Sequence, residues 1–445
     1  MDTQAWICKW VDRHAKEFAD LSQEIWSCAE LSGQEYKSSQ ALCKMLEKYG
    51  FTIQPGVAKM QTAFSARYGE NGPVIGFLGE YDALESLSQK AGSAVCEAVS
   101  ETTSGHGCGH NLLGVGSLAA AVAVKEYLEQ NHLPGSVVYY GCPSEEQGCG
   151  KMHMLEGDCF RELDAALTWH PLDRNEVDGT SSLASLCMEF CFNGRSAHAA
   201  FCPEKGRNAL HAVELMNIAV NFMREHITSD VRIHYVISNS GGTATNVIQS
   251  SASVIYEVRA PREEQIQELS KRIIKSAEGA ALMTETQMTF SYGDHYMNFI
   301  PNNTINQVVW EKFQIVGAPD FTPEETELAR SLRDTVCPGS LDEMPFDLSL
   351  TPYRGIGGYL AASTDVGNVS HLVPAIQLYT VCCAKGTPTH SWQMVSQAGS
   401  SIGQKGMLTA AKVLALAGAE LLQNPEILHK AKLEHVQCKA AGTAE

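Results

Sequence analysis

Short apolar runs alternate with longer amphipathic segments over the first part of the chain and again near its end. Short apolar runs closed by a turn residue are typical of buried strands, whereas apolar residues three or four positions apart indicate helices. The predicted strands are residues 74–78, 136–143, 165–171 and 375–382, and the predicted helices are residues 38–50, 111–131 and 401–422. This alternation predicts an α/β fold with a mainly parallel sheet and helices on both of its faces.

The pattern changes near residue 183. Strands are predicted at 185–194, 232–240, 252–261 and 284–293, and helices at 206–226 and 261–283. The order β-α-β-β-α-β is that of a ferredoxin-like α+β domain. Because the earlier pattern then returns, we predict an insertion, with residues 1–182 and 295–445 forming one domain and residues 183–294 the other. The segment 335–359, rich in Pro and Gly, is predicted to be an ordered surface loop.

Composition narrows the class of protein. The chain has 445 residues, 44% of them hydrophobic, and a formal net charge of −18, which argues against nucleic acid and an anionic membrane as partners. The first residues lack a basic segment followed by an apolar one, and no uninterrupted apolar stretch reaches about 18 residues, so we expect neither a secretory leader nor a membrane span. Fifteen cysteines then indicate free thiols in a reducing compartment, and we expect a cytoplasmic location.

Groups that bind metals occur at the ends of the predicted strands and in glycine-rich turns. Cys108-x-His110 follows such a turn and precedes a helix, where a thiolate beside an imidazole suits a soft divalent metal. Three interpretations of Cys108 stay open from the local sequence: metal ligand, catalytic nucleophile or buried structural thiol. His106, in the same turn, is expected to be a structural residue rather than a further ligand.

Two adjacent carboxylates, Glu145 and Glu146, follow the predicted strand 136–143. Since like charges repel, one of them is expected to bind a metal or to have a raised pKa. In a metal-assisted hydrolase, one carboxylate can bind metal while the other takes a proton from water.

Two histidines and two further carboxylates complete the candidate centre. His170 ends the strand 165–171, and His390 follows the strand 375–382 and a Gly-x-Pro turn. Each is predicted to bind one of two metal ions. Asp82 is a candidate for orienting a metal-bound histidine, and Glu80 is assigned a supporting role beside it.

The inserted domain carries residues that could select the substrate. His198 lies in the string GRSAHAA and could polarise the scissile carbonyl, whereas Asn246 and Arg259 offer an amide and a guanidinium fork. A substrate with a free carboxylate, such as an acylated amino acid, could be held by that fork. A surface ion pair is the alternative for Arg259.

These strings, in this order, resemble the M20 metallopeptidase family, in its Cys-containing amidohydrolase branch. The string GHGCGHN, the Glu-Glu pair, the strand-end histidine, the string GRSAHAA and the late THSW carry the resemblance, which spans nearly the whole chain. GEYDAL, YGCPSEE and GTPTHSWQ are further similar to family members that hydrolyse p-aminobenzoyl-glutamate. The chain departs from the family pattern at the H-x-D motif, which reads Glu80-Tyr81-Asp82, and at Asn111, where the family has Asp. Cys108 replaces a bridging Asp, and the loop 335–359 is shorter.

The resemblance implies a zinc-peptidase-like catalytic domain with a centre for two divalent metal ions, Zn or Mn, and a lid domain that also mediates dimerisation. It implies a base, Glu145, and a set of metal ligands: Cys108, His110, Glu146, His170 and His390. It further implies that His198 acts on the site of the partner subunit, and that Asn246 and Arg259 contact the carboxylate or carbonyl of the substrate.

The function predicted from the sequence is therefore a metal-dependent amidohydrolase. It would cleave an N-acyl amino acid or a dipeptide-like amide with a free carboxylate, with p-aminobenzoyl-glutamate, a folate breakdown product, the first substrate to try. A dipeptidase and a non-catalytic subunit of a hetero-oligomeric hydrolase are the alternatives. A homodimer, or a heterodimer with a related A-type subunit, is the expected assembly.

Overall fold

The computed structural model describes residues 3–99, 103–340 and 343–442. The chain forms two compact units. The first comprises the described residues of Met1–Thr180, Ile300–Gly358 and Asn368–Ala440, and the second comprises Ser181–Phe299 and Tyr359–Gly367. Residues 341–342 of the predicted loop 335–359 lie outside the described residues.

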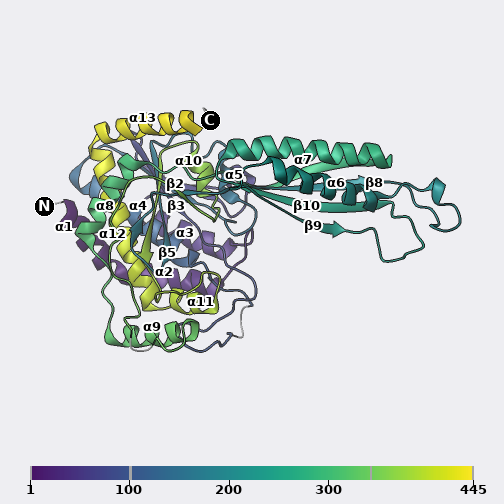
Figure 1. Cartoon of the computed structure of the whole chain (residues 1–445). Helices are drawn as coiled ribbons and strands as arrows, with labels where there is room; N and C mark the ends of the chain where they lie inside the picture. Colours follow the sequence, from purple (N-terminus) through teal and green to yellow (C-terminus); the bar gives the residue numbers. More distant parts are fainter. Residues whose placement is uncertain (1–2, 100–102, 341–342, 443–445) are drawn as a thin grey trace. The chain divides into compact units, whose positions relative to one another are not determined.

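A seven-stranded sheet is the centre of the first unit (Figure 1). Its strands, in spatial order, are β1 (Thr52–Pro55), β2 (Phe64–Tyr68), β4 (Ser136–Gly141), β3 (Val74–Gly79), β5 (Ala165–Leu172), β13 (Ala375–Val381) and β6 (Glu176–Val177). The middle four, β4-β3-β5-β13, run parallel to one another, and β1, β2 and β6 are antiparallel additions at the edges. The prediction of a mainly parallel sheet is confirmed.

Helices surround this sheet. They are α1 (Thr3–Arg13), α2 (Ala15–Cys28), α3 (Tyr36–Lys48), α4 (His110–Asn131), α5 (Gly150–Glu156), α8 (Asn303–Val316), α9 (Pro323–Val336), α11 (Trp392–Ala398), α12 (Ser401–Gln423) and α13 (Pro425–Gly442). Within α10 (Val366–Ser370) the chain passes from the second unit back to the first. Short 3-10 helices cover Val57–Lys59, Pro203–Lys205 and Arg224–His226.

Small residues let α4 lie close to the sheet. A Cβ at Gly114 would come within 2.5 Å of the Glu80 carbonyl oxygen, and one at Gly116 within 2.7 Å of the Trp169 ring. α12 packs beside α4, and Gly418 of α12 faces both Phe77 of β3 and Val124 of α4. By length and composition α12 could cross a membrane, but most of its apolar window is buried, as in a core helix.

The second unit is a four-stranded antiparallel sheet with two helices on one face (Figure 1). Its strands are β8 (Ala184–Asn193), β9 (Arg232–Asn239), β10 (Ser251–Ala260) and β11 (Gln287–Tyr296), in the spatial order β11-β8-β10-β9, and its helices are α6 (Ala209–Met223) and α7 (Glu263–Thr284). The predicted β-α-β-β-α-β order is therefore present. The segment Tyr359–Gly367 joins this unit, because β12 (Tyr359–Leu360) pairs in parallel with β7 (Ser181–Ser182).

Candidate metal centre

The candidate ligands of the first unit meet at one edge of its sheet, where the four parallel strands end. Glu80 follows β3, the Glu145-Glu146 pair follows β4, His170 lies near the end of β5, and His390 follows β13. The carboxyl ends of parallel strands share one edge, which is where sites collect in such sheets. The amino-terminal end of α4 brings Cys108 and His110 to the same place.

Cys108, His110 and His170 form a first group, whose ligand atoms all lie within 4.8 Å of one another. The Cys108 Sγ lies 3.2 Å from His170 Nε2. Between Cys108 and His110, Gly109 has φ +79°, and a Cβ there would come within 2.7 Å of Pro171. A glycine is therefore needed at this position for both side chains to reach the site.

Cys108, Glu146 and His390 form a second group with the same spacing, so the thiol is common to both groups. His390 Nε2 lies 3.4 Å from a Glu146 carboxylate oxygen. His390 has φ +58°, and its backbone N–H donates to the Gly107 carbonyl at 2.8 Å. Such a backbone conformation is uncommon for residues other than glycine and is more frequent at functional sites.

Asp82 forms hydrogen bonds with a residue of each group. One of its oxygens accepts a hydrogen bond from His110 Nδ1 at 2.7 Å. The other accepts from the Glu146 backbone N–H at 2.9 Å and from the Ser32 hydroxyl at 2.8 Å. Although burial raises the pKa of a carboxyl group, the His110 ring lowers that of Asp82 to about 2. The ionised carboxylate therefore places a proton on Nδ1 and leaves His110 Nε2 directed at the site.

His170 is oriented in the same way. Its Nδ1 donates to the Pro171 carbonyl at 3.0 Å, so Nε2 faces Cys108 with a free electron pair. Burial, together with the nearby His110, lowers the pKa of His170 to about 4. The imidazole is therefore neutral at pH 7, which is the form that binds metals.

The residues of these groups fit divalent cations. His110 Nε2 and Glu146 Oε1 are buried and have no hydrogen-bond partner among the described residues. Burial raises the pKa of the Cys108 thiol far above its ordinary range, so a thiolate here needs a bound cation to stabilise it. A donor set of thiolate, imidazole and carboxylate suits Zn²⁺ and neighbouring transition metals.

A third group comprises Glu80, His110 and Glu145. Glu80 Oε2 lies 3.2 Å and Glu145 Oε2 lies 4.0 Å from His110 Nε2. The other oxygen of Glu80 accepts a hydrogen bond from the Lys151 ammonium at 2.5 Å. His106 belongs to none of the three groups, and its Nε2 lies 3.2 Å from the Ile25 carbonyl oxygen.

Of the two adjacent carboxylates, Glu146 does not have the raised pKa that repulsion alone would give. Burial acts to raise it, but the hydrogen bond with His390 lowers it below the ordinary value. Glu145 is the more open of the pair, with a side chain 14% exposed.

The residues expected to contact substrate lie in the second unit. The His198 Nδ1 accepts hydrogen bonds from the backbone N–H groups of Ala200 and Phe201, so the ring proton is on Nε2. Asn246 is next to this turn, because its carbonyl accepts from the Ala199 N–H at 2.9 Å. Arg259, on β10, donates through Nε and an Nη group to one oxygen of Glu257, at 3.0 and 2.7 Å.

Two buried charged residues escaped the sequence analysis. Lys151 follows the Glu145-Glu146 segment in a short helix whose pattern does not distinguish a buried lysine from an exposed one. Glu35 accepts hydrogen bonds from the Ser144 N–H at 2.8 Å, the Gly33 N–H at 3.0 Å and the Thr62 hydroxyl at 2.9 Å. It stands in a polar stretch, SGQEYKSSQ, that reads as a solvent-exposed helix start.

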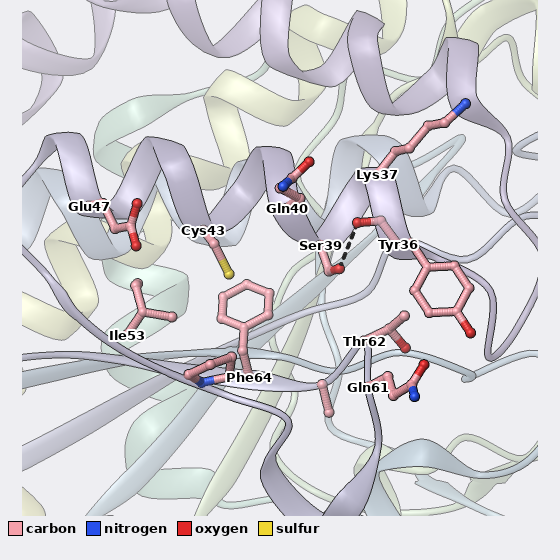
Figure 2. Close-up of a pocket in the computed structure, with 12 residues that line it drawn as sticks. Tyr36, Lys37, Ser39, Gln40, Cys43, Glu47, Ile53, Gln61, Thr62 and Phe64 are labelled. Atoms are coloured by element: carbon pink, nitrogen blue, oxygen red, sulfur yellow. Dashed lines mark hydrogen bonds between the residues drawn. The ribbon is translucent and has the colours of Figure 1, made fainter.

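An open hollow between α3 and the outer strands β1 and β2 is a competing candidate (Figure 2). Its lining includes Tyr36, Gln40, Cys43, Ile53 and Phe64, and none of the predicted site residues. Burial raises the pKa of Cys43 to about 12, so its thiol is a poor nucleophile at pH 7. The hollow therefore offers less chemistry than the sheet edge.

Comparison with known proteins identifies the class to which this fold and site belong. The chain belongs to the M20 family of peptidases and amidohydrolases, and it is a homologue of the metallo-hydrolases in that family. It is 39% identical to one of the subunits of p-aminobenzoyl-glutamate hydrolase from Escherichia coli, over 96% of this chain and 93% of the relative. It is 29% identical to the Xaa-Arg dipeptidase of Mus musculus over 96% of this chain and 91% of the relative. The family resemblance predicted from the sequence is confirmed.

The second unit and the whole fold have matches of their own. Residues 181–283 match the peptidase dimerisation domain of the M20 family. A dinuclear metal binding M20 peptidase of Bacillus subtilis matches with a TM-score of 0.61 and 16% identity over 93% of this chain and 99% of that one. An aminobenzoyl-glutamate utilization protein of Klebsiella pneumoniae matches with a TM-score of 0.66 and 17% identity over 94% of this chain and 98% of that one. These structures confirm the predicted fold.

Proposed function

We propose that the protein is an amidohydrolase that uses two divalent metal ions, Zn²⁺ or Mn²⁺, to cleave an N-acyl amino acid or a dipeptide-like amide with a free carboxylate. The observation that carries this proposal is the buried Cys108 thiol, which is shared by two separate ligand groups. A single buried thiol between two such groups could serve a pair of cations, because its sulfur has electron pairs for both.

The first ion would be held by Cys108, His110 and His170, and the second by Cys108, Glu146 and His390. When bound, such cations lower the pKa of water towards about 7 and polarise a carbonyl group. Glu145 is the proposed base, because its Oε2 lies 4.0 Å from His110 Nε2, beside both groups, and it belongs to neither proposed ligand set. It would accept a proton from water and pass that proton to the nitrogen of the leaving amine.

The second unit would bind the substrate. The proton on His198 Nε2 can be donated to the scissile carbonyl oxygen, where negative charge develops during attack. The Arg259 guanidinium would bind the substrate carboxylate, aided by Asn246. Since Glu257 already accepts hydrogen bonds from Arg259, the substrate carboxylate has to share or displace it.

The choice of p-aminobenzoyl-glutamate as the first substrate rests on the relative from Escherichia coli, which is similar over nearly its whole length. A dipeptide ending in Arg is the second substrate to try, because the mouse Xaa-Arg dipeptidase is similar over the same extent. The net charge of −18 is compatible with a cationic substrate.

The test is an assay of the chain alone, first freed of metal with EDTA and then supplied with Mn²⁺ or Zn²⁺. We expect hydrolysis of p-aminobenzoyl-glutamate only after metal is restored, and little hydrolysis of the matched substrate whose carboxylate is amidated. Glu145→Gln should retain both ions and the fold but lose about 10³-fold in kcat, because the base is removed.

Three outcomes would contradict the proposal. Full activity after EDTA treatment would favour Cys108 as a thiol nucleophile. An active, metal-loaded Glu145→Gln protein would exclude Glu145 as the base. Inactivity on every substrate, with metal bound, would favour a non-catalytic subunit that needs a related partner chain.

A further inference from the structure

A buried ion pair next to the candidate metal centre takes no part in the function proposed above. Lys151, on α5, has a fully buried side chain, and its ammonium lies 2.5 Å from Glu80 Oε1. The Glu80 side chain is 3% exposed. Charges withdrawn from water in this way are costly unless they are paired, and removing one partner leaves the other uncompensated.

By distance alone, Glu80 could itself bind a metal ion. Its Oε2 lies 3.2 Å from His110 Nε2, and it belongs to the third ligand group, with His110 and Glu145. The position of the Glu80 carboxylate alone therefore does not explain why the centre should consist of the five other residues and exclude Glu80. The difference between Glu80 and those residues is its cationic partner.

The Lys151 ammonium separates Glu80 from the five proposed ligands. It lies 2.5 Å from Glu80 Oε1 and both side chains are buried, so the negative charge of Glu80 is compensated within the pair. An ammonium bound to one carboxylate oxygen also withdraws electron density from the other, which makes it a weaker ligand.

The pair also fixes the chain on either side of the site. Glu80 directly follows β3, and Lys151 is the second residue of α5, a few positions after Glu146. An ion pair between these two positions holds the end of the Glu145-Glu146 segment against the end of β3.

We propose that Lys151 is a positioning residue that withholds Glu80 from the metal ions, so that the centre binds two ions through Cys108, His110, Glu146, His170 and His390 alone. This inference rests on the proposed two-metal function. It predicts that a carboxylate at position 80 becomes a metal ligand when the ammonium is removed, and that removing both groups leaves the centre as it was.

The test is a Co²⁺ titration followed by visible absorption, which reports the coordination number and the thiolate-to-metal charge transfer independently of activity. The wild type should bind two Co²⁺ ions per chain. In Lys151→Met the freed carboxylate should add a ligand, which weakens the d–d bands and tightens binding about tenfold. In Glu80→Leu/Lys151→Met the spectrum, the stoichiometry and the affinity should return to wild-type values.

Lys125→Met is the matched control. Lys125 is also a buried lysine bonded to carboxylates, Glu126 and Glu129, but these lie on α4 away from the ligand groups. Its Co²⁺ spectrum should equal that of the wild type, which separates the effect at Glu80 from the general cost of losing a buried lysine.

The outcomes distinguish this inference from the proposed function. A wild type that binds no Co²⁺ would overturn both. A wild type that binds two ions, combined with a double variant that loses one ion or changes its spectrum, would overturn the inference alone, because Glu80 would then be a native ligand. A folded Lys151→Met protein with the wild-type spectrum and affinity would overturn it as well. If Lys151→Met does not fold, the double variant still decides, since it removes both charges of the buried pair together.

Discussion

Buried carboxylates organise the candidate centre from outside the ligand groups. Asp82 orients His110 and binds the backbone of Glu146. Glu35 binds the N–H of Ser144, a residue with φ +60° that immediately precedes Glu145. These two carboxylates thus fix the His110 ring and the backbone segment that the proposed chemistry uses, although neither belongs to a ligand group.

Glu35 provides a prediction about pH. Burial, and then the charge of Asp82, raise its pKa above the ordinary value of 4.5. A group whose pKa is higher in the folded state stabilises the fold below its unfolded pKa, and this contribution is lost as the pH rises through the folded pKa. Glu35→Gln removes this titration but keeps an oxygen for the Ser144 N–H. We therefore expect the unfolding free energy of the wild type, relative to this variant, to fall between about pH 5 and about pH 8.

Urea unfolding of both proteins at the two pH values measures this difference. Glu17→Gln is the control: burial acts to raise the pKa of Glu17, but its bond with Lys48 lowers it overall below the ordinary 4.5, so its contribution should be the same at both pH values. A relative stability of Glu35→Gln that does not change with pH would contradict the account of Glu35.

The sequence predicted the candidate ligands because their residue types are rare next to apolar strand ends. Cys108, His170 and His390 stand out for that reason. Lys151 and Glu35 did not stand out, because burial of a charged residue depends on which segments pack over it, and no local pattern records this. The contact between Arg259 and Glu257 could be predicted from the sequence, since residues two apart on a strand share one face.

At the scale of elements, α4 sets the position of the centre. Its glycines let the helix approach β3 and β5, and this approach carries Cys108 and His110 to the end of the sheet. The central strands and the long helices were predicted correctly, because their apolar residues form long or strongly periodic patterns. The outer strands β1, β2 and β6 were not predicted, since they are short and contain no run of apolar residues.

Gly114→Ala tests this close approach. The added methyl would come within 2.5 Å of the Glu80 carbonyl oxygen, which is backbone and cannot rotate away. We expect a loss of about 1–3 kcal/mol in unfolding free energy, as for other overpacked sites.

Gly279→Ala, on α7, is the control, because a Cβ there meets nothing within 4 Å. It should be stabilising by about 0.5–1 kcal/mol, since alanine favours a helix interior over glycine. Urea unfolding of each variant gives the sign of the change in unfolding free energy. A Gly114→Ala protein as stable as the wild type would contradict the packing described for α4.

At the scale of the whole molecule, the chain combines a unit that holds the candidate centre with a unit that matches a dimerisation domain. The second unit leaves β9 as an edge strand, and Tyr235, Val236 and Ile237 on it are exposed. Exposed apolar edge strands are usually covered in a native assembly. We infer that the protein forms a dimer, with itself or with a related chain, in which this edge is covered.

Val236→Lys should therefore break a homodimer. Val236 is 60% exposed, so the substitution is tolerated by the isolated chain, while a charge on an edge strand opposes pairing. Light scattering of the wild type should give about twice the chain mass of 48.3 kDa, and the variant should give the chain mass itself.

Val95→Lys is the control, since Val95 is 66% exposed in a loop of the first unit, and it should stay dimeric. A dimeric Val236→Lys protein would place the interface elsewhere. A monomeric wild type would instead favour the heterodimer.

The central claim is that Cys108 joins two metal ions in one centre, and anomalous diffraction from crystals grown with Zn²⁺ or Mn²⁺ tests it most directly. We predict two anomalous peaks per chain, one among Cys108, His110 and His170 and the other among Cys108, Glu146 and His390. A single peak, no peak, or a peak held only by Glu80, His110 and Glu145 would contradict the account.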